Sequence, residues 1–294
     1  MLALSPRQLA ALVFVTLIWG LNWPVMKLGV QHFPPLTFRA LSMAAALPVL
    51  WLALRAQRVP LALPRAHWPR VFWLTLFNLA LWNAPMILAM PLLSSGRAAI
   101  LGYTMPIFSA LLGAALYHDR LSARGWAGVA AAALGVLLLL WNELASMSGR
   151  PLGVTLMLLA ALSWAYGTQM LRRCEVPVAT ATLAFWMMAG AALMIGAAGI
   201  AVETRQWHAP DASAVWAIAY NALLVLSLAQ IAWFSLARHL PPLASTLSVM
   251  MIPVIGVFVG ALWLGEPLHW QDWSAMGLMS VAIVSVLWPA RAPA

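Results

Sequence analysis

The chain has 294 residues, of which 64% are hydrophobic and only 8% charged, and its mean hydropathy is +0.90. Soluble globular domains are about a quarter charged and just under half apolar, so this composition excludes a soluble enzyme, a disordered chain and a nucleic-acid-binding domain. The net charge of +9 comes mainly from fifteen Arg and one Lys that are scattered at the ends of apolar runs. Such scattered cations are typical of charges that set the topology of a membrane protein.

Ten apolar runs, separated by prolines and polar clusters, follow one another along the chain. A helix that crosses the hydrocarbon core needs about 20 residues, and each run is close to that length. The predicted spans are 8–28, 35–55, 68–90, 95–117, 123–142, 152–172, 178–202, 213–237, 242–264 and 270–289. With the N-terminus in the cytoplasm, eleven Lys and Arg side chains fall inside and four outside. The positive-inside rule therefore predicts that both termini are cytoplasmic.

The two halves of the chain repeat each other. At a shift of 147 or 145 positions the equivalent pairs are Pro106 and Pro253, Asp119 and Glu266, Trp126 and Trp273, and Trp19 and Trp164. We interpret 1–147 and 148–294 as five-helix repeats of one integrated transmembrane domain. Because five is odd, the second repeat enters the membrane in the opposite orientation. The expected fold is an all-α membrane protein of ten transmembrane helices, built as two inverted repeats around a central cavity, an arrangement typical of secondary transporters.

Several segments carry a resemblance to a known family. The motif 19–24, Arg39 and the stretch 97–119 resemble the first repeat of the drug/metabolite transporter superfamily, and 163–165 and 244–268 resemble its second, EamA-type repeat. Within that superfamily the chain is most similar to the bacterial aromatic amino acid exporters. The resemblance implies a multi-pass protein of the bacterial inner membrane that exports neutral amino acids, with aromatic and large apolar ones preferred.

Polar side chains within a span are costly and usually face the protein interior or a cavity. Asn83 and Gln230 are equivalent under the 147 shift. For each of them, and for Asn78 and Asn221, a place in the cavity and a hydrogen bond between helices remain alternatives. Deep aromatic residues suit an apolar side chain, and methionine adapts to several shapes. The predicted substrate-binding residues are Trp19, Asn22, Trp82, Asn83, Tyr103, Trp164, Ser227 and Gln230.

Arg39 is the strongly charged residue that falls inside a span. It is suited to pairing with a substrate carboxylate, but it could also extend to the membrane surface or pair with carbonyl groups at a helix end. We favour the structural pairing with helix-end carbonyls.

The sequence lacks the residues that ATP-driven transport, enzyme catalysis or metal binding would need. No Walker loop occurs, and none of the seven Asp and Glu residues lies in the middle of a span. We therefore predict no enzyme activity, no cofactor and no metal site. The expected partners are a small-molecule substrate, namely an amino acid, and membrane lipid, without nucleic acid, and the expected state is a monomer. The alternative functions are export of other small metabolites, nucleosides or cationic drugs, or a pore-like channel.

Overall fold

The computed structural model describes residues 5–119, 121–145, 151–236 and 242–287, and every regular element in these ranges is a helix. Seven of the ten predicted spans contain one continuous helix, namely α1 (Pro6–Gln31), α2 (Pro35–Ala56), α7 (Ala123–Ala145), α8 (Pro151–Arg172), α9 (Thr180–Glu203), α12 (Pro242–Leu264) and α13 (Trp270–Leu287). The other three contain interrupted helices, namely η1 (Arg65–His67), α3 (Trp68–Leu74), η2 (Thr75–Ala80) and α4 (Leu81–Ala89); α5 (Ser95–Gly102) and α6 (Met105–Tyr117); and α10 (Ala212–Ala219), η4 (Tyr220–Ala229) and α11 (Gln230–Leu236). A short 3₁₀ turn, η3 (Thr204–Gln206), follows α9.

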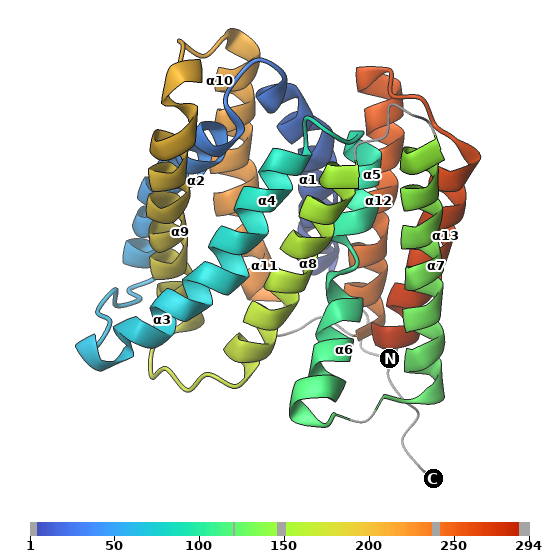
Figure 1. Cartoon of the computed structure of the whole chain (residues 1–294). Helices are drawn as coiled ribbons and strands as arrows, with labels where there is room; N and C mark the ends of the chain where they lie inside the picture. Colours follow the sequence, from blue (N-terminus) through green and yellow to red (C-terminus); the bar gives the residue numbers. More distant parts are fainter. Residues whose placement is uncertain (1–4, 120, 146–150, 237–241, 288–294) are drawn as a thin grey trace.

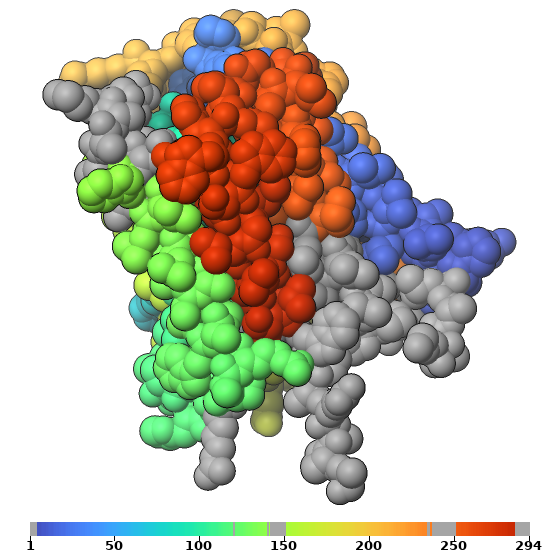
Figure 2. Space-filling view, turned by 90° about the vertical axis from the view of Figure 1, so that its right-hand side faces the viewer, coloured from blue at the N-terminus to red at the C-terminus, as the bar shows by residue number. Residues whose placement is uncertain are grey.

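The helices have the length and the surface of membrane-spanning segments. Among the described residues, seven helical segments are long and apolar enough to cross a bilayer, and the stretches Ala123–Leu139 and Met251–Leu264 are shorter apolar helices. Large apolar side chains point outward, with Leu262 exposed by 85% and Leu193 by 75%. The face formed by α7, α12 and α13 carries several of them (Figure 2). An apolar exterior of this extent indicates contact with lipid rather than water.

Three interruptions shape the bundle in ways that hydrophobic patterning does not reveal. The fourth predicted span breaks after Gly102 and resumes at Met105, because Pro106 lacks the N–H that would bond to the Gly102 carbonyl. The third and eighth spans contain the wide-turn π-helices η2 and η4. The 147 shift places 75–80 on 222–227, inside η4, so the two π-helices occupy equivalent places in the two halves. Such wide turns occur frequently at functional sites.

Two helices, α1 and α8, lie in the middle of the bundle. Helix α1 packs against α12, α10, η4 and α11, and α8 packs against α4, η2, α5 and α6. The pairs α2–α9 and α7–α13 stand at opposite edges (Figure 1). Every residue of α1 from Asn22 to Met26 is buried, so this segment is enclosed on all sides.

One end of the bundle, which we call the glutamate end, is closed by carboxylates that bind helix N-termini. Helix α2 begins after Pro34, which cannot cap it, so its first N–H groups need an acceptor from elsewhere. Glu203 accepts hydrogen bonds from the backbone N–H groups of Leu36 and Thr37, both at 2.8 Å. Glu266 likewise accepts from the backbone N–H of Ser95 at the start of α5, at 2.8 Å, and from its hydroxyl at 2.6 Å. A negative charge at these positions also matches the helix dipole.

Cations complete the glutamate end, which is at the top of Figure 1. Lys27, near the end of α1, donates to the carbonyl oxygens of Met90 and Leu93, both at 2.8 Å. Arg97 pairs with Asp272 at 2.7 Å, and both side chains are largely buried. At this end, Lys27 joins α1 to the end of α4, Arg97 joins the starts of α5 and α13, and the two glutamates join α9 to α2 and α12 to α5.

The opposite end, which we call the Arg173 end, is joined by more exposed contacts. Arg173 pairs with Asp119 at 3.1 Å and lies 3.6 Å from the ring centroid of Tyr117. Gln169 donates to the hydroxyl of Ser109 at 3.0 Å and links α8 to α6. The Asp119 side chain is 54% exposed, whereas that of Asp272 at the glutamate end is 5% exposed. The glutamate end is therefore the more tightly closed of the two.

Candidate functional site

Arg39 lies at the centre of the site. It is on α2 and only 4% exposed. Its Nε donates to Oδ1 of Asn83 at 2.7 Å, and its Nη1 donates to Oδ1 of Asn221 at 2.9 Å. The Sδ of Met26 lies 3.9 Å from Nη1. We call Arg39, Asn83 and Asn221 the arginine cluster. The expectation that Arg39 pairs with helix-end carbonyls is wrong, because Arg39 donates its hydrogen bonds to amide side chains of two other helices.

The two asparagines are held with their oxygens toward Arg39. The amide nitrogen of Asn83 donates to the Leu79 carbonyl at 2.8 Å, and that of Asn221 donates to the Ala217 carbonyl at 3.0 Å. Each of these bonds reaches four residues back along the chain and leaves Oδ1 as an acceptor. Asn83 belongs to α4 in the first half of the chain and Asn221 to η4 in the second. The arginine cluster therefore joins the two halves in the interior.

Within the described residues, Arg39 has no counter-ion and one unused nitrogen. No carboxylate among the described residues pairs with it. A guanidinium has five N–H donors on three nitrogens, and in the described part of the chain Nη2 makes no hydrogen bond. A full positive charge is thus buried against neutral oxygens and a sulfur atom.

Asn22 is a second incompletely bonded polar group. It lies on α1, one helical turn before Met26, and is 8% exposed. Its Oδ1 is enclosed and has no hydrogen-bond partner among the described residues. Residues four apart in a helix lie on the same face, so Asn22 and Met26 share a face of α1. A buried acceptor without a donor costs free energy unless a ligand or water supplies the donor.

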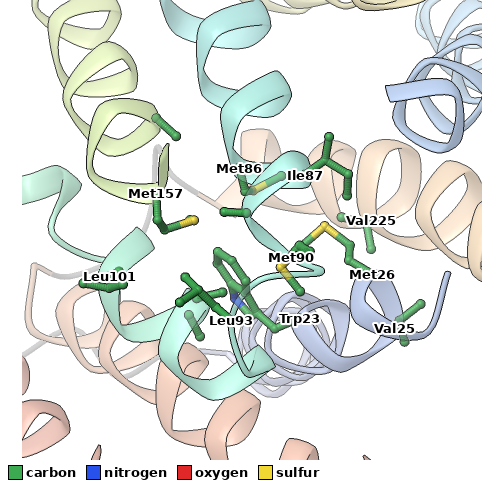
Figure 3. Packing of buried hydrophobic residues seen from close by; sticks show 14 of the residues in the cluster. Trp23, Val25, Met26, Met86, Ile87, Met90, Leu93, Leu101, Met157 and Val225 are labelled. Carbon is green, nitrogen blue, oxygen red and sulfur yellow. The ribbon is translucent and has the colours of Figure 1, made fainter. Parts of the chain in front are cut away.

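An apolar group of methionines lies beside the arginine cluster. We call Met26, Met86, Met90 and Met157 with Trp23 the methionine cluster; these residues come from α1, the end of α4 and α8, and all are buried (Figure 3). On α4, Met86 follows Asn83 by three residues and so lies on nearly the same face. The ring of Trp23 and the methyl group of Met157 both approach Gly102, where an added Cβ would lie 2.8 Å and 2.9 Å from them. Flexible thioethers give this wall an adaptable shape.

The predicted aromatic residues are divided between this region and other parts of the bundle. Tyr103 lies near the methionine cluster, with its ring 6.5 Å from that of Trp23, and its hydroxyl makes no hydrogen bond within the described residues. Trp19 packs against Trp233 at 5.5 Å. Trp82 and Trp164 are partly buried. No hydrogen bond among the described residues joins Trp19 or Trp164 to the arginine cluster, and their binding role remains a prediction.

The predicted polar residues also separate into groups. Asn83 belongs to the arginine cluster, whereas its equivalent Gln230 is half-buried and its side chain makes no hydrogen bond with a described residue. Ser227 is fully buried and donates to the Ala222 carbonyl in its own helix at 2.6 Å. Asn78 points away from Arg39 and donates to the hydroxyl of Thr168 on α8 at 3.1 Å. Asn78 is therefore a contact between helices, and only Asn83 and Asn221 take part in the arginine cluster.

Two cavities of the described structure lie outside these clusters. One of about 630 Å³ opens at the glutamate end and is lined by Gln31, Phe33 and His208 among others. Another of about 300 Å³ is lined by Leu28, Trp216 and neighbouring residues. Neither includes a predicted substrate-binding residue. The predicted central cavity therefore remains a prediction.

The sequence interpretation missed the binding of helix N-termini by Glu203 and Glu266 and the arrangement of amides around Arg39. One signal was present for Glu203, because a helix that begins with two prolines has no side-chain cap of its own and needs an external acceptor. No comparable signal existed for the arginine cluster. Its three members are far apart in the chain, and only the packing of α2 against α4 and η4 brings them together.

Comparisons with known proteins agree with this architecture. The EamA-like transporter family matches the chain twice, over residues 7–141 and 151–288. The chain is 30% identical over 289 residues to the uncharacterized inner membrane transporter YedA of Escherichia coli K12, covering 96% of this chain and 92% of that one. It is 27% identical over 269 residues to a probable amino-acid metabolite efflux pump of Salmonella typhimurium, covering 87% and 86% of the two chains.

A solved protein structure has the same fold, with a TM-score of 0.66 at 19% identity, over 94% of this chain and 97% of the other. At that identity the likeness concerns the fold alone. The family match, by contrast, extends over nearly all of both halves. The chain therefore belongs to the EamA-like transporter family.

Proposed function

We propose that the protein exports neutral amino acids across the bacterial inner membrane, with aromatic and large apolar ones preferred. Transport proceeds by alternating access, in which two five-helix repeats, 1–147 and 148–294, rock around a shared substrate site. A relative named as an inner membrane transporter and another named as a probable amino-acid metabolite efflux pump support the location and the class of substrate.

Equivalent local geometry in the two halves supports an inverted repeat of ten spans. His118 and Gly265, which are 147 residues apart, both have positive φ, at 56° and 66°. The next residue in each half, Asp119 or Glu266, donates its N–H to the carbonyl six residues earlier, at 3.1 Å and 3.3 Å. The helix before this turn therefore ends in the same left-handed C-terminal conformation in both halves. Helix packing is equivalent in the two halves as well. Helix α1 contacts α12, and its equivalent α8 contacts α5 and α6, which are together the equivalent of α12.

The observation that carries the proposal is the arginine cluster. An ionisable group buried within a membrane-spanning region is costly and usually marks a substrate pathway. This one is formed by helices of both halves, which is where inverted-repeat transporters bind substrate. The methionine cluster beside it supports the preference for large apolar side chains. Cytoplasmic termini would place the glutamate end on the periplasmic side.

Counterflow in proteoliposomes tests the proposal. Vesicles that contain the purified protein and are loaded with unlabelled amino acid should accumulate external radiolabelled L-phenylalanine, saturably and more than vesicles without protein. L-Leucine and L-methionine should compete more strongly than glycine. Failure of all twenty labelled amino acids to show counterflow would contradict amino-acid export, and flux that never saturates would indicate a pore.

A further inference from the structure

We propose that Arg39 binds the carboxylate of the amino-acid substrate and that Oδ1 of Asn22 accepts a hydrogen bond from its ammonium group. This inference rests on the proposed function and assigns the two charged ends of the substrate to particular atoms. A substrate without a carboxylate, such as an amine or an amino-acid amide, should then bind poorly.

The charge of Arg39 is the first step. A guanidinium remains protonated and charged in proteins, and moving a charge out of water is strongly unfavourable unless it is paired. The arginine cluster supplies two amide oxygens but no negative charge. In the described part of the chain, Arg97 and Arg173 both have a carboxylate partner, whereas Arg39 has none. A substrate carboxylate would supply the negative charge that offsets the cost of burying the Arg39 guanidinium.

The geometry of the guanidinium is the second step. Asn83 occupies Nε, and Asn221 and Met26 occupy Nη1. Nη2 is left without a hydrogen bond to any described residue. The two N–H donors of this nitrogen are therefore available to a ligand. Here the asparagines hold the guanidinium in position and leave donors for a ligand, as charge-assisted recognition of a carboxylate requires.

Asn22 supplies the third step. Its enclosed Oδ1 is an acceptor that lacks a donor, which is the complement of the ammonium group of an amino acid. Asn22 lies about 6 Å along α1 from Met26, since four residues rise about 1.5 Å each, and the Sδ of Met26 lies 3.9 Å from Nη1 of Arg39. A donor for the carboxylate and an acceptor for the ammonium therefore stand about one helical turn apart. The methionine cluster adjoins both and provides a wall for the side chain.

Competition in the counterflow assay tests the assignment on the unmodified protein. Labelled L-phenylalanine is the transported probe. The competitors are unlabelled L-phenylalanine, L-phenylalaninamide, which lacks the carboxylate, and 3-phenylpropionate, which lacks the ammonium. We expect each analogue to inhibit at least tenfold more weakly than L-phenylalanine. If L-phenylalanine is transported but its amide inhibits equally well, the assignment of Arg39 is overturned and amino-acid export stands.

Variants then assign each end of the substrate. Arg39→Gln should bring the inhibition constants of L-phenylalanine and its amide within about twofold of each other, and Arg39→Lys should retain part of the difference. Asn22→Ala should reduce the difference between L-phenylalanine and 3-phenylpropionate but keep that between the acid and the amide. Asn78→Ala is the matched control, because Asn78 is also 8% exposed but bonds to α8. It should leave both ratios unchanged.

The outcomes separate this inference from the proposed function. Unchanged ratios in Arg39→Gln and Asn22→Ala would show that both residues are structural only. Equal changes in Asn78→Ala would show a general loosening of the bundle and would also contradict the assignment. If Arg39→Gln cannot be purified in a folded form, Arg39→Lys and the competition on the unmodified protein still decide the role of Arg39. Absence of counterflow with every labelled amino acid would refute the proposed function itself.

Discussion

Arg39 and Arg97 are both buried arginines, but their surroundings differ. Arg97, at the glutamate end, pairs with the carboxylate of Asp272 at 2.7 Å. Arg39, in the arginine cluster, bonds within the described residues to the amide oxygens of Asn83 and Asn221 and the sulfur of Met26. The Arg97–Asp272 pair is electrically complete, whereas no described carboxylate pairs with Arg39, which lies one turn inside the start of α2. We conclude that the Arg97–Asp272 pair serves closure and that the arginine cluster is suited to a ligand.

Replacing each arginine by glutamine gives the largest expected contrast. Arg97→Gln leaves the buried carboxylate of Asp272 without its cation and should lower the free energy of unfolding by about 3 kcal/mol. Arg39→Gln leaves no stranded carboxylate and should keep or raise the melting temperature, while counterflow of L-phenylalanine falls at least tenfold. Thermal unfolding of the detergent-purified variants and counterflow measure the two effects. Equal destabilisation by both substitutions would remove the distinction between the Arg97–Asp272 pair and the arginine cluster.

A substitution at Gly102 tests the packing of the methionine cluster. A Cβ at this position would lie 2.8 Å from the Trp23 ring and 2.9 Å from the Met157 methyl group. Gly102→Ala should therefore cost about 1–3 kcal/mol through overpacking and weaken transport. Gly277→Ala is the control, because nothing lies within 4 Å of its added Cβ. Alanine at position 277 should leave the melting temperature unchanged or slightly higher, and a similar loss in both variants would contradict the tight contact at Gly102.

Substitutions of the equivalent amides Asn83 and Gln230 test whether the substrate path includes both residues. Asn83→Ala removes one acceptor from Arg39 and should impair counterflow severalfold while the protein still inserts and folds. Gln230→Ala should also impair counterflow if Gln230 faces the same substrate path. Membrane insertion and gel-filtration profiles provide the control for folding. Normal transport by both variants would show that these amides serve only in packing.

The smallest contrast compares the equivalent acids at the two ends. Glu266→Ala removes the acceptor for the first N–H of α5 and should cost about 1 kcal/mol, as loss of a helix cap does. Asp119→Ala removes an exposed ion pair and should cost no more than about 0.5 kcal/mol. Thermal unfolding measures both. A larger loss for Asp119→Ala would mean that the Arg173 end, rather than the glutamate end, is the tighter closure.

Much of the fold was predictable because apolar runs and charges are local properties of the chain. Helices occupy all ten predicted ranges, with described ends within three residues of the predicted ones. Membership of the EamA family was also evident from the motifs at 19–24 and 244–268. The deviations within spans were not predictable to the same degree. Pro106 signals the break between α5 and α6, but no residue type marks the π-helices η2 and η4.

The site was less accessible from the sequence. Asn83 and Arg39 could be named as polar groups within spans, but the sequence left open whether Asn78 and Asn83 bond between helices or face a cavity. Which partner each would meet depended on helices that are distant in the chain. Asn221 lies 182 residues from Arg39, and Glu203 lies 167 residues from Leu36.

The amino-acid sequence alone thus determined which ranges of the chain are helical, since a segment must be long and apolar to satisfy its backbone in lipid. It also determined the family and the repetition of the two halves. Only the tertiary structure decided that Arg39 is surrounded by neutral amides and that Glu203 and Glu266 bind helix N-termini. Those facts depend on the packing of helices against one another, which brings together side chains whose separation along the chain carries no local pattern.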